Sequence, residues 1–203
     1  MGWVWLFATS IAAQTGSGPS FSLPSKGSEV VVRLIERIDG IESEEAGPTT
    51  TVFADGRVVV ERPSYMKQAG RHETRLSPED LRAWLATLLE TGVTEFDSQR
   101  TRGDREAADR AHRLKQVGRS GTEVFDRSSA SRIDFELYVD DFRAAAKGPG
   151  AEETVRKKID WRGLRRDASR YSELEDLQSL EAAVRMTRTL GRKSIVEATG
   201  SAK

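Results

Sequence analysis

Residues 49–61 read TTTVFADGRVVVE, and this stretch decides the fold. Both halves are rich in β-branched residues, and Asp55-Gly56 stands between them. Such a dipeptide between two β-rich runs favours a two-residue type I′ turn, because the turn needs a positive φ that glycine adopts without steric cost. The stretch therefore predicts an antiparallel hairpin with strands at 49–54 and 57–61.

Further strands are predicted on either side of this hairpin. Residues 30–35 (VVVRLI) are β-branched and apolar on both faces, which is typical of a central strand. Residues 71–76 are polar and suit a fourth strand at an edge, where charge discourages pairing with foreign chains.

Two later segments, 132–139 and 154–161, alternate between apolar and polar residues as half-buried strands do. If they pair, acidic and basic side chains face one another, and each such pair contributes about 0.2–1 kcal/mol. The four residues concerned are Asp134, Glu136, Arg156 and Lys158.

A first amphipathic helix follows the polar strand. Ser77 is its expected N-cap, Pro78 occupies the first helical position, and Gly92 closes it. One apolar stripe runs along it, at Leu81, Trp84, Leu85, Leu88 and Leu89.

A second amphipathic helix is expected near the C-terminus. Ser172 and Glu175 have the spacing of a capping box, and Gly191 is the expected stop. Its inward residues are Leu174, Leu177, Leu180, Val184 and Leu190.

These elements predict an α+β fold, an antiparallel β-sheet with two amphipathic helices packed on one face. The order is β-β-β-(β)-α, insert, β-β-α. The expected unit is a single domain over 29–190. It is interrupted at 98–130 by a charged insert of low order, with at most a short helix near Asp104–Val117, and followed by a flexible tail at 191–203.

The N-terminus has the features of an export signal. The run Trp3–Ala13 (WVWLFATSIAA) would span about 16 Å as a helix, too short to cross a bilayer but long enough for a signal peptide. No basic residue precedes Lys26, unlike most signal peptides. We interpret residues 1–13 as a signal peptide and 14–28 as a Gly/Ser/Pro-rich linker; the alternative for the run is a buried strand. The expected location is periplasmic or secreted.

Composition excludes several classes of site. The 203 residues contain no cysteine and no asparagine, so disulfides, thiol nucleophiles, Cys-type zinc sites and N-glycosylation acceptors cannot occur. The 32 basic and 32 acidic residues balance, so no global field favours nucleic acid or an anionic membrane.

Catalytic motifs are incomplete. Ser64-Tyr65-Met66-Lys67 matches Ser-x-x-Lys, but the companion motifs of penicillin-recognising enzymes are missing. His72-Glu73 begins like a zinc-protease motif, yet Leu76 replaces the second histidine, and His112 is far away in sequence. We therefore predict no catalytic residue, no metal ligand and no cofactor.

One basic patch is a candidate site for a partner. Seven basic residues occur with Trp161 and Tyr171 among or beside them, a composition that can bind nucleic acid or an acidic partner. An exported protein rarely meets nucleic acid, which favours an acidic protein or polymer. The alternative is that Trp161 is core and the charges balance the acidic loop Asp39–Glu45. The patch consists of Arg156, Lys157, Lys158, Arg162, Arg165, Arg166 and Arg170.

Three runs carry a family resemblance: Phe53–Val58 (FADGRV), Arg75–Leu81 (RLSPEDL) and Gly92–Phe96 (GVTEF). In this order they resemble a module of small exported bacterial proteins of unknown function, over residues 29–97 with a looser echo in 131–190. The chain is also loosely similar to emfourin-type protease inhibitors, which implies inhibition as an activity. The resemblance transfers no functional residue.

The sequence thus favours an exported, non-enzymatic module of the cell envelope that binds a macromolecule or has a structural role. Binding could use the polar strand edge near Arg71–Arg75 or the basic patch. The alternatives are a protease-inhibitor-like protein and a hydrolase whose site, around His72 or paired carboxylates, is assembled from separate loops. The sequence does not define an oligomeric state.

Overall fold

The computed structural model describes residues 18–37, 47–116, 131–144 and 153–200. The predicted signal peptide and the acidic loop Asp39–Glu45 lie outside these residues. In chain order the elements are β1 (Ser20–Ser22), β2 (Val30–Arg37), β3 (Thr49–Phe53), β4 (Arg57–Arg62), β5 (Gly70–Arg75), α1 (Pro78–Glu90), a short 3-10 helix η1 (Val93–Glu95), α2 (Ser98–Gln116), β6 (Arg132–Arg143), β7 (Glu153–Arg162), α3 (Leu164–Arg170) and α4 (Glu175–Gly200).

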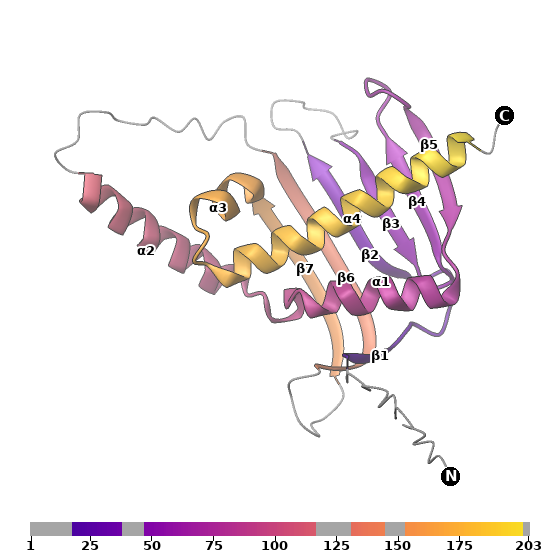
Figure 1. The fold of residues 1–203 in the computed structure, drawn as a ribbon, viewed down its shortest axis with the longest axis horizontal. Coiled ribbons are helices and arrows are strands. Elements are labelled where there is room, and N and C mark those ends of the chain that lie inside the picture. The colour runs from indigo at the N-terminus through magenta and orange to yellow at the C-terminus, as the bar shows by residue number, and fades with distance from the viewer. Residues whose placement is uncertain (1–17, 38–46, 117–130, 145–152, 201–203) are drawn as a thin grey trace, which may run out of the picture.

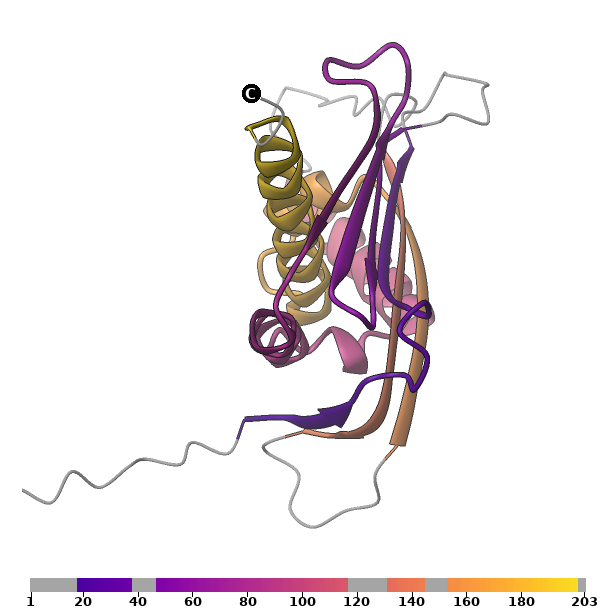
Figure 2. The same ribbon diagram turned by 90° about the vertical axis from the view of Figure 1, so that its right-hand side faces the viewer.

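The fold is α+β, with an antiparallel sheet in which neighbouring strands follow the order β7-β6-β2-β3-β4-β5. β1 lies in the predicted linker and pairs with the far end of β6, past the stretch paired with β2. The helices lie on one face of the sheet, and none of the helices in the described residues covers the opposite face, here called the open face (Figures 1 and 2). α4 crosses the strands diagonally, whereas α2 projects beyond the β7 edge (Figure 1).

The hairpin forms where the sequence predicts it, with Val52 opposite Val58. Its turn differs from the predicted type I′. Gly56 has a φ of +84°, but Asp55 is not among the described non-glycine residues with positive φ. The connection is instead a three-residue loop closed by the Gly56 N–H, which donates to the Phe53 carbonyl at 3.0 Å. A Cβ on Gly56 would lie 2.5 Å from the Leu76 carbonyl oxygen, so the close approach of the next segment also requires glycine.

The core lies between the sheet and the two predicted helices. Ser77 caps α1 by accepting a hydrogen bond from the Asp80 N–H at 3.0 Å, as expected. The predicted α1 stripe is buried except for Trp84, which is only half-buried and packs against the core margin. Side chains with no more than 2% exposure join sheet and helices: Leu34, Phe135, Leu85, Leu88, Leu177, Leu180 and Val184.

Both predicted ends of α4 were wrong. The helix begins at Glu175, so Leu174 rather than Ser172 precedes it. It also continues beyond Gly191 to Gly200. Gly191 serves a close contact instead of a stop, since a Cβ there would lie 2.7 Å from Thr50 Oγ1 on β3.

The insert is also more regular than expected. Residues 98–116 form the helix α2, longer than the short helix predicted near 104–117, and the prediction of low order was wrong for this part. Asp97 Oδ1 accepts from the N–H groups of Gln99 and Arg100 at 2.8 and 3.0 Å, and these backbone hydrogen bonds hold the pKa of Asp97 below its usual value. Within the described part of the chain, no helix is long and apolar enough to cross a membrane.

Candidate anion-binding site

The predicted basic patch is divided among different surfaces. On β7 the side chains alternate, so Lys157 lies on the helix-covered face and Arg156, Lys158 and Arg162 lie on the open face. Lys157 Nζ donates to the Phe96 carbonyl at 2.9 Å. The remaining three residues, Arg165, Arg166 and Arg170, are on α3.

Two of the open-face members on β7, Lys158 and Arg156, pair with carboxylates of β6. Lys158 Nζ lies 3.4 Å from Glu136, as the strand pairing predicts, and hydrogen bonding to Tyr138 and then the charge of Glu136 raise the pKa of Lys158. Arg156 stands opposite Tyr138 and donates to Asp140 at 2.9 Å. These exposed ion pairs connect β6 with β7, and each contributes little to the stability of the fold.

Two other patch members contribute to a cavity of about 400 Å³ beside the edge strand β7, here called the edge cavity. Its walls come from α2, β6, β7 and α3, segments far apart in sequence. The lining residues are Arg102, Arg105, Arg132, Asp160, Trp161, Arg162 and Arg166.

A buried carboxylate organises the inner wall of the edge cavity. Asp167 is 3% exposed, and its Oδ2 accepts from Trp161 Nε1 at 3.2 Å and from Arg105 at 3.1 Å. Arg166 reaches its Oδ1 at 3.4 Å. Because one carboxylate holds the indole and two guanidinium groups, these side chains are oriented before any ligand arrives.

The outer wall is organised in the same way. Arg132 makes a two-pronged contact with Asp160, at 2.7 and 2.8 Å. Arg102 donates to the Asp160 carbonyl at 3.1 Å, and the guanidinium groups of Arg102 and Arg105 lie 5.7 Å from the Trp161 ring centroid. Five arginines therefore lie around Asp160 and Asp167, and the wall of the edge cavity is predominantly basic.

The basic surface continues across the open face. Strand register places Arg37, Arg132 and Arg162 opposite one another on β2, β6 and β7, a row about 10 Å long at the usual strand spacing. Arg37 Nε also donates to Asp134 at 2.8 Å. We call this row and the edge cavity together the basic edge. Its guanidinium groups are spread over a surface longer than a single small ion.

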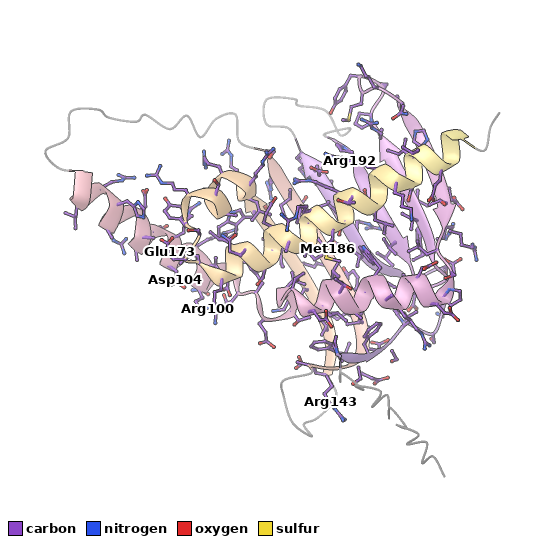
Figure 3. The ribbon with its side chains drawn as sticks, viewed as in Figure 1. Arg100, Asp104, Arg143, Glu173, Met186 and Arg192 are labelled. Atoms are coloured by element: carbon purple, nitrogen blue, oxygen red, sulfur yellow. The ribbon has the colours of Figure 1, made fainter. Side chains whose placement is uncertain are left out.

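Polar contacts also attach α2 to α3 and α4. Asp109 accepts from the Tyr171 hydroxyl at 2.9 Å and lies 3.4 Å from Arg170, the last patch member. Burial alone would raise the pKa of Asp109, but hydrogen bonds from Tyr171 and Arg113 outweigh it and lower that pKa. Burial, together with the bond to Asp109, raises the pKa of Tyr171. Figure 3 shows the neighbouring junction, where Arg100 and Asp104 of α2 lie near Glu173 before α4.

The first turn of α2 makes a second contact of this kind. Arg100 donates to both oxygens of Asp176 at 3.0 and 2.8 Å, and the Thr101 hydroxyl donates to the same carboxylate at 2.7 Å. Hydrogen bonding to Asp176 and its charge raise the pKa of Arg100.

The incomplete catalytic motifs lie apart from the basic edge. Ser64 and Lys67 are exposed between β4 and β5. His72 Nε2 lies 2.8 Å from the Gln68 carbonyl, and the His112 ring contacts Tyr171 edge-on at 5.9 Å. In the ranges that the structure describes, no three His, Asp or Glu side chains are grouped as a metal site.

Sequence reasoning missed four members of the basic edge: Arg37, Arg102, Arg105 and Arg132. A signal for two of them existed, because Arg102 and Arg105 are three residues apart and share a face once 98–116 is recognised as a helix. The other two meet Arg162 only through strand register, which the sequence does not specify.

In comparisons with known proteins, no family model, no curated protein and no solved structure matched the chain. The resemblance to small exported proteins and to emfourin-type inhibitors therefore stays a prediction.

Proposed function

We propose that this protein is an exported, non-enzymatic binding module of the cell envelope whose partner is an acidic macromolecule held at the basic edge. The observation that carries the proposal is the convergence of five arginines from four elements on one cavity. Guanidinium groups form two-pronged hydrogen bonds with carboxylate and phosphate, so a cluster of them suits a repeating anion.

The geometry favours an acidic polypeptide or other acidic polymer over single-stranded nucleic acid. Binding of unpaired bases relies on exposed aromatic rings on which the bases stack. Trp161 and Tyr171, the aromatic residues of the predicted patch, are only 2% and 4% exposed. Arginine guanidinium groups lie over both rings, which are therefore not available for stacking with bases.

The hydrolase alternative gains no support from the carboxylate–hydroxyl pairs. Asp109 with Tyr171, and Asp176 with Thr101, each hold α2 against its neighbours, and neither pair lines the edge cavity. Both carboxylates also pair with arginine, Asp109 with Arg113 at 2.6 Å and Asp176 with Arg100 at 2.8 Å, so their oxygens already have donors within the protein.

Titration with poly-L-glutamate tests the proposal. We expect wild-type protein to bind it with an affinity that falls steeply as salt rises, and Arg132→Ala/Arg162→Ala to bind at least tenfold more weakly, since a hydrogen bond to a charged group contributes about 1.5–3 kcal/mol. The matched control is Arg82→Ala/Arg185→Ala, which removes the same charge from exposed positions on α1 and α4.

Equal affinity in the two double variants would refute the basic edge as the binding site. A capture experiment from the native envelope then distinguishes partners. An acidic protein or polymer, lost in the Arg132→Ala/Arg162→Ala variant, supports the proposal. A protease captured equally by both variants supports the inhibitor alternative instead.

A further inference from the structure

A second cavity of about 400 Å³ lies on the helix-covered face, between α4 and the ends of β2, β3 and β4. We call it the α4 cavity. Its walls combine several aliphatic side chains with arginines, whereas Trp161 is the one apolar side chain among the described residues that line the edge cavity. The lining residues are Glu36, Pro48, Thr50, Val60, Arg62, Met66, Ser131, Arg165, Arg188, Gly191, Arg192 and Ile195.

The inner part of the α4 cavity is apolar. Val60 of β4 and Ile195 of α4 are 2% and 6% exposed, and Met66 is half-buried. Gly191 presents no side chain at the point where α4 comes closest to Thr50. An apolar group of modest size therefore has a surface to contact there.

The mouth of the α4 cavity is cationic. Arg188 is neutralised by Glu36, with its Nε 2.8 Å from the carboxylate, and Arg62 donates to the neutral Gln68 side chain at 3.3 Å. The side chains of Arg165 and Arg192 make no hydrogen bond or ion pair with any residue that the structure describes. Figure 3 shows Arg192 on α4, on the side of the helix that faces the ends of β2, β3 and β4. Among its lining residues the mouth thus has an excess of three positive charges, those of Arg62, Arg165 and Arg192, and none of the three pairs with a carboxylate of the described residues.

The two cavities lie on opposite sides of the start of α3. Arg165 lines the α4 cavity and Arg166 the edge cavity, and likewise Ser131 lines the first and Arg132 the second. The sites are close but share no lining residue, so each can be altered without changing the other.

We propose that the α4 cavity binds a small anionic amphiphile, a carboxylate or phosphate joined to a short apolar chain. The head group would meet Arg165 and Arg192, and the chain would lie on Val60, Ile195 and Met66. A volume of about 400 Å³ falls within the usual range for small-molecule sites and holds about a dozen groups the size of a water molecule. This proposal is independent of the acidic macromolecule at the basic edge.

Calorimetric titration with decanoate and octyl phosphate tests this inference, with 1-decanol and decyltrimethylammonium as neutral and cationic probes. We expect both anions to bind with one site per chain, and the neutral and cationic probes to bind at least tenfold more weakly. Failure of both anions to bind, or equal binding of decanol, would overturn the proposal.

Variants and methyl resonances locate the site. Arg165→Ala/Arg192→Ala should weaken decanoate binding at least tenfold, while Arg82→Ala/Arg185→Ala should not change it. The Met66 methyl signal should shift on binding and that of Met186, which lies outside the cavity lining, should not (Figure 3). A shift at Met186 alone, or unchanged affinity in Arg165→Ala/Arg192→Ala, would contradict the assignment.

The two proposals fail separately. Arg165→Ala/Arg192→Ala should retain poly-L-glutamate binding, and Arg132→Ala/Arg162→Ala should retain decanoate binding. Loss of both ligands in either variant would mean that the two cavities are not distinct sites, and would overturn the assignment of the amphiphile to the α4 cavity.

Discussion

The two ends of the helix layer are held to the sheet by different forces. α1 and α4 pack apolar stripes on β2, β3, β4 and β6, where side chains such as Leu85 and Leu180 have no measurable exposure. Among the α2 side chains that the structure describes, only Ala108 packs against the margin of the core. This helix, at the β7 edge, is attached instead by carboxylates, Asp167, Asp176 and its own Asp109, with arginine or hydroxyl partners.

This difference separates the part that determines the fold from the part that holds the basic edge. Burial of apolar surface is non-directional and strong, so the α1/α4 end supplies stability. Arginine–carboxylate contacts contribute less net free energy because desolvation opposes them, but they orient charged groups. The α2 end therefore holds guanidinium groups in place where a partner can reach them.

The largest expected effect is at the apolar end. Leu85→Ala should lower the free energy of unfolding by about 2–5 kcal/mol, because it removes buried methyl groups and leaves a cavity. Leu114→Ala, at a position 75% exposed on α2, is the control and should change stability by less than about 0.5 kcal/mol. Urea unfolding monitored by circular dichroism measures both. Equal losses would contradict the assignment of the core.

An intermediate effect is expected at the buried carboxylate. Asp167→Ala leaves Trp161 Nε1 and two guanidinium groups without this partner and should cost about 1–3 kcal/mol. Asp160→Ala removes a half-exposed carboxylate nearby and should cost less than about 1 kcal/mol. Hydrogen exchange should accelerate in α2 for Asp167→Ala and leave α1 protected. Uniform acceleration in both helices would mean that α2 and the core unfold together.

The smallest effect is a pH dependence of the Asp109–Tyr171 contact. The pKa of Asp109 is lowered on folding, so its contribution is present above the ordinary value of 3.8 and is lost as pH falls through the folded value. The pKa of Tyr171 is raised, so its contribution is present below 10.0 and is lost as pH rises further. Tyr171→Phe should flatten the alkaline decline in stability, whereas Tyr65→Phe, in an exposed turn, should not. An unchanged alkaline decline in Tyr171→Phe would show that another group causes it.

The sequence predicted most of the apolar α1/α4 end of the helix layer and missed much of the polar α2 end. Periodic leucines and the Ser77 cap located α1, and alternation located β6 and β7. Apolar period indicated only a short helix near 104–117 and missed the start of α2, because the contacts of this helix are made by Arg100, Arg105 and Asp109, residue types that also occur in solvated loops. Gly191 was misread because a glycine that permits close packing has the same sequence signal as one that ends a helix.

Of the residues in the candidate site, the sequence predicted only those that belong to one continuous basic segment. Arg162 and Arg166 belong to the basic patch that the sequence predicted. The other residues of this patch lie on both faces of the sheet and on α3. Arg132 joins the site through the pairing of β6 with β7, and Arg102 and Arg105 through the docking of α2. Such long-range contacts depend on the whole fold.

The most direct test of the central claim is the indole N–H resonance of Trp161 during titration with poly-L-glutamate. This group lies in the wall of the edge cavity and donates to Asp167, whereas Trp84 lies on α1 and serves as the internal reference. Trp84→Phe and Trp161→Phe assign these two signals among those of the four tryptophans of the sequence. The account predicts a saturable shift of the Trp161 signal alone, abolished in Arg132→Ala/Arg162→Ala. An unmoved Trp161 signal at full binding would contradict it.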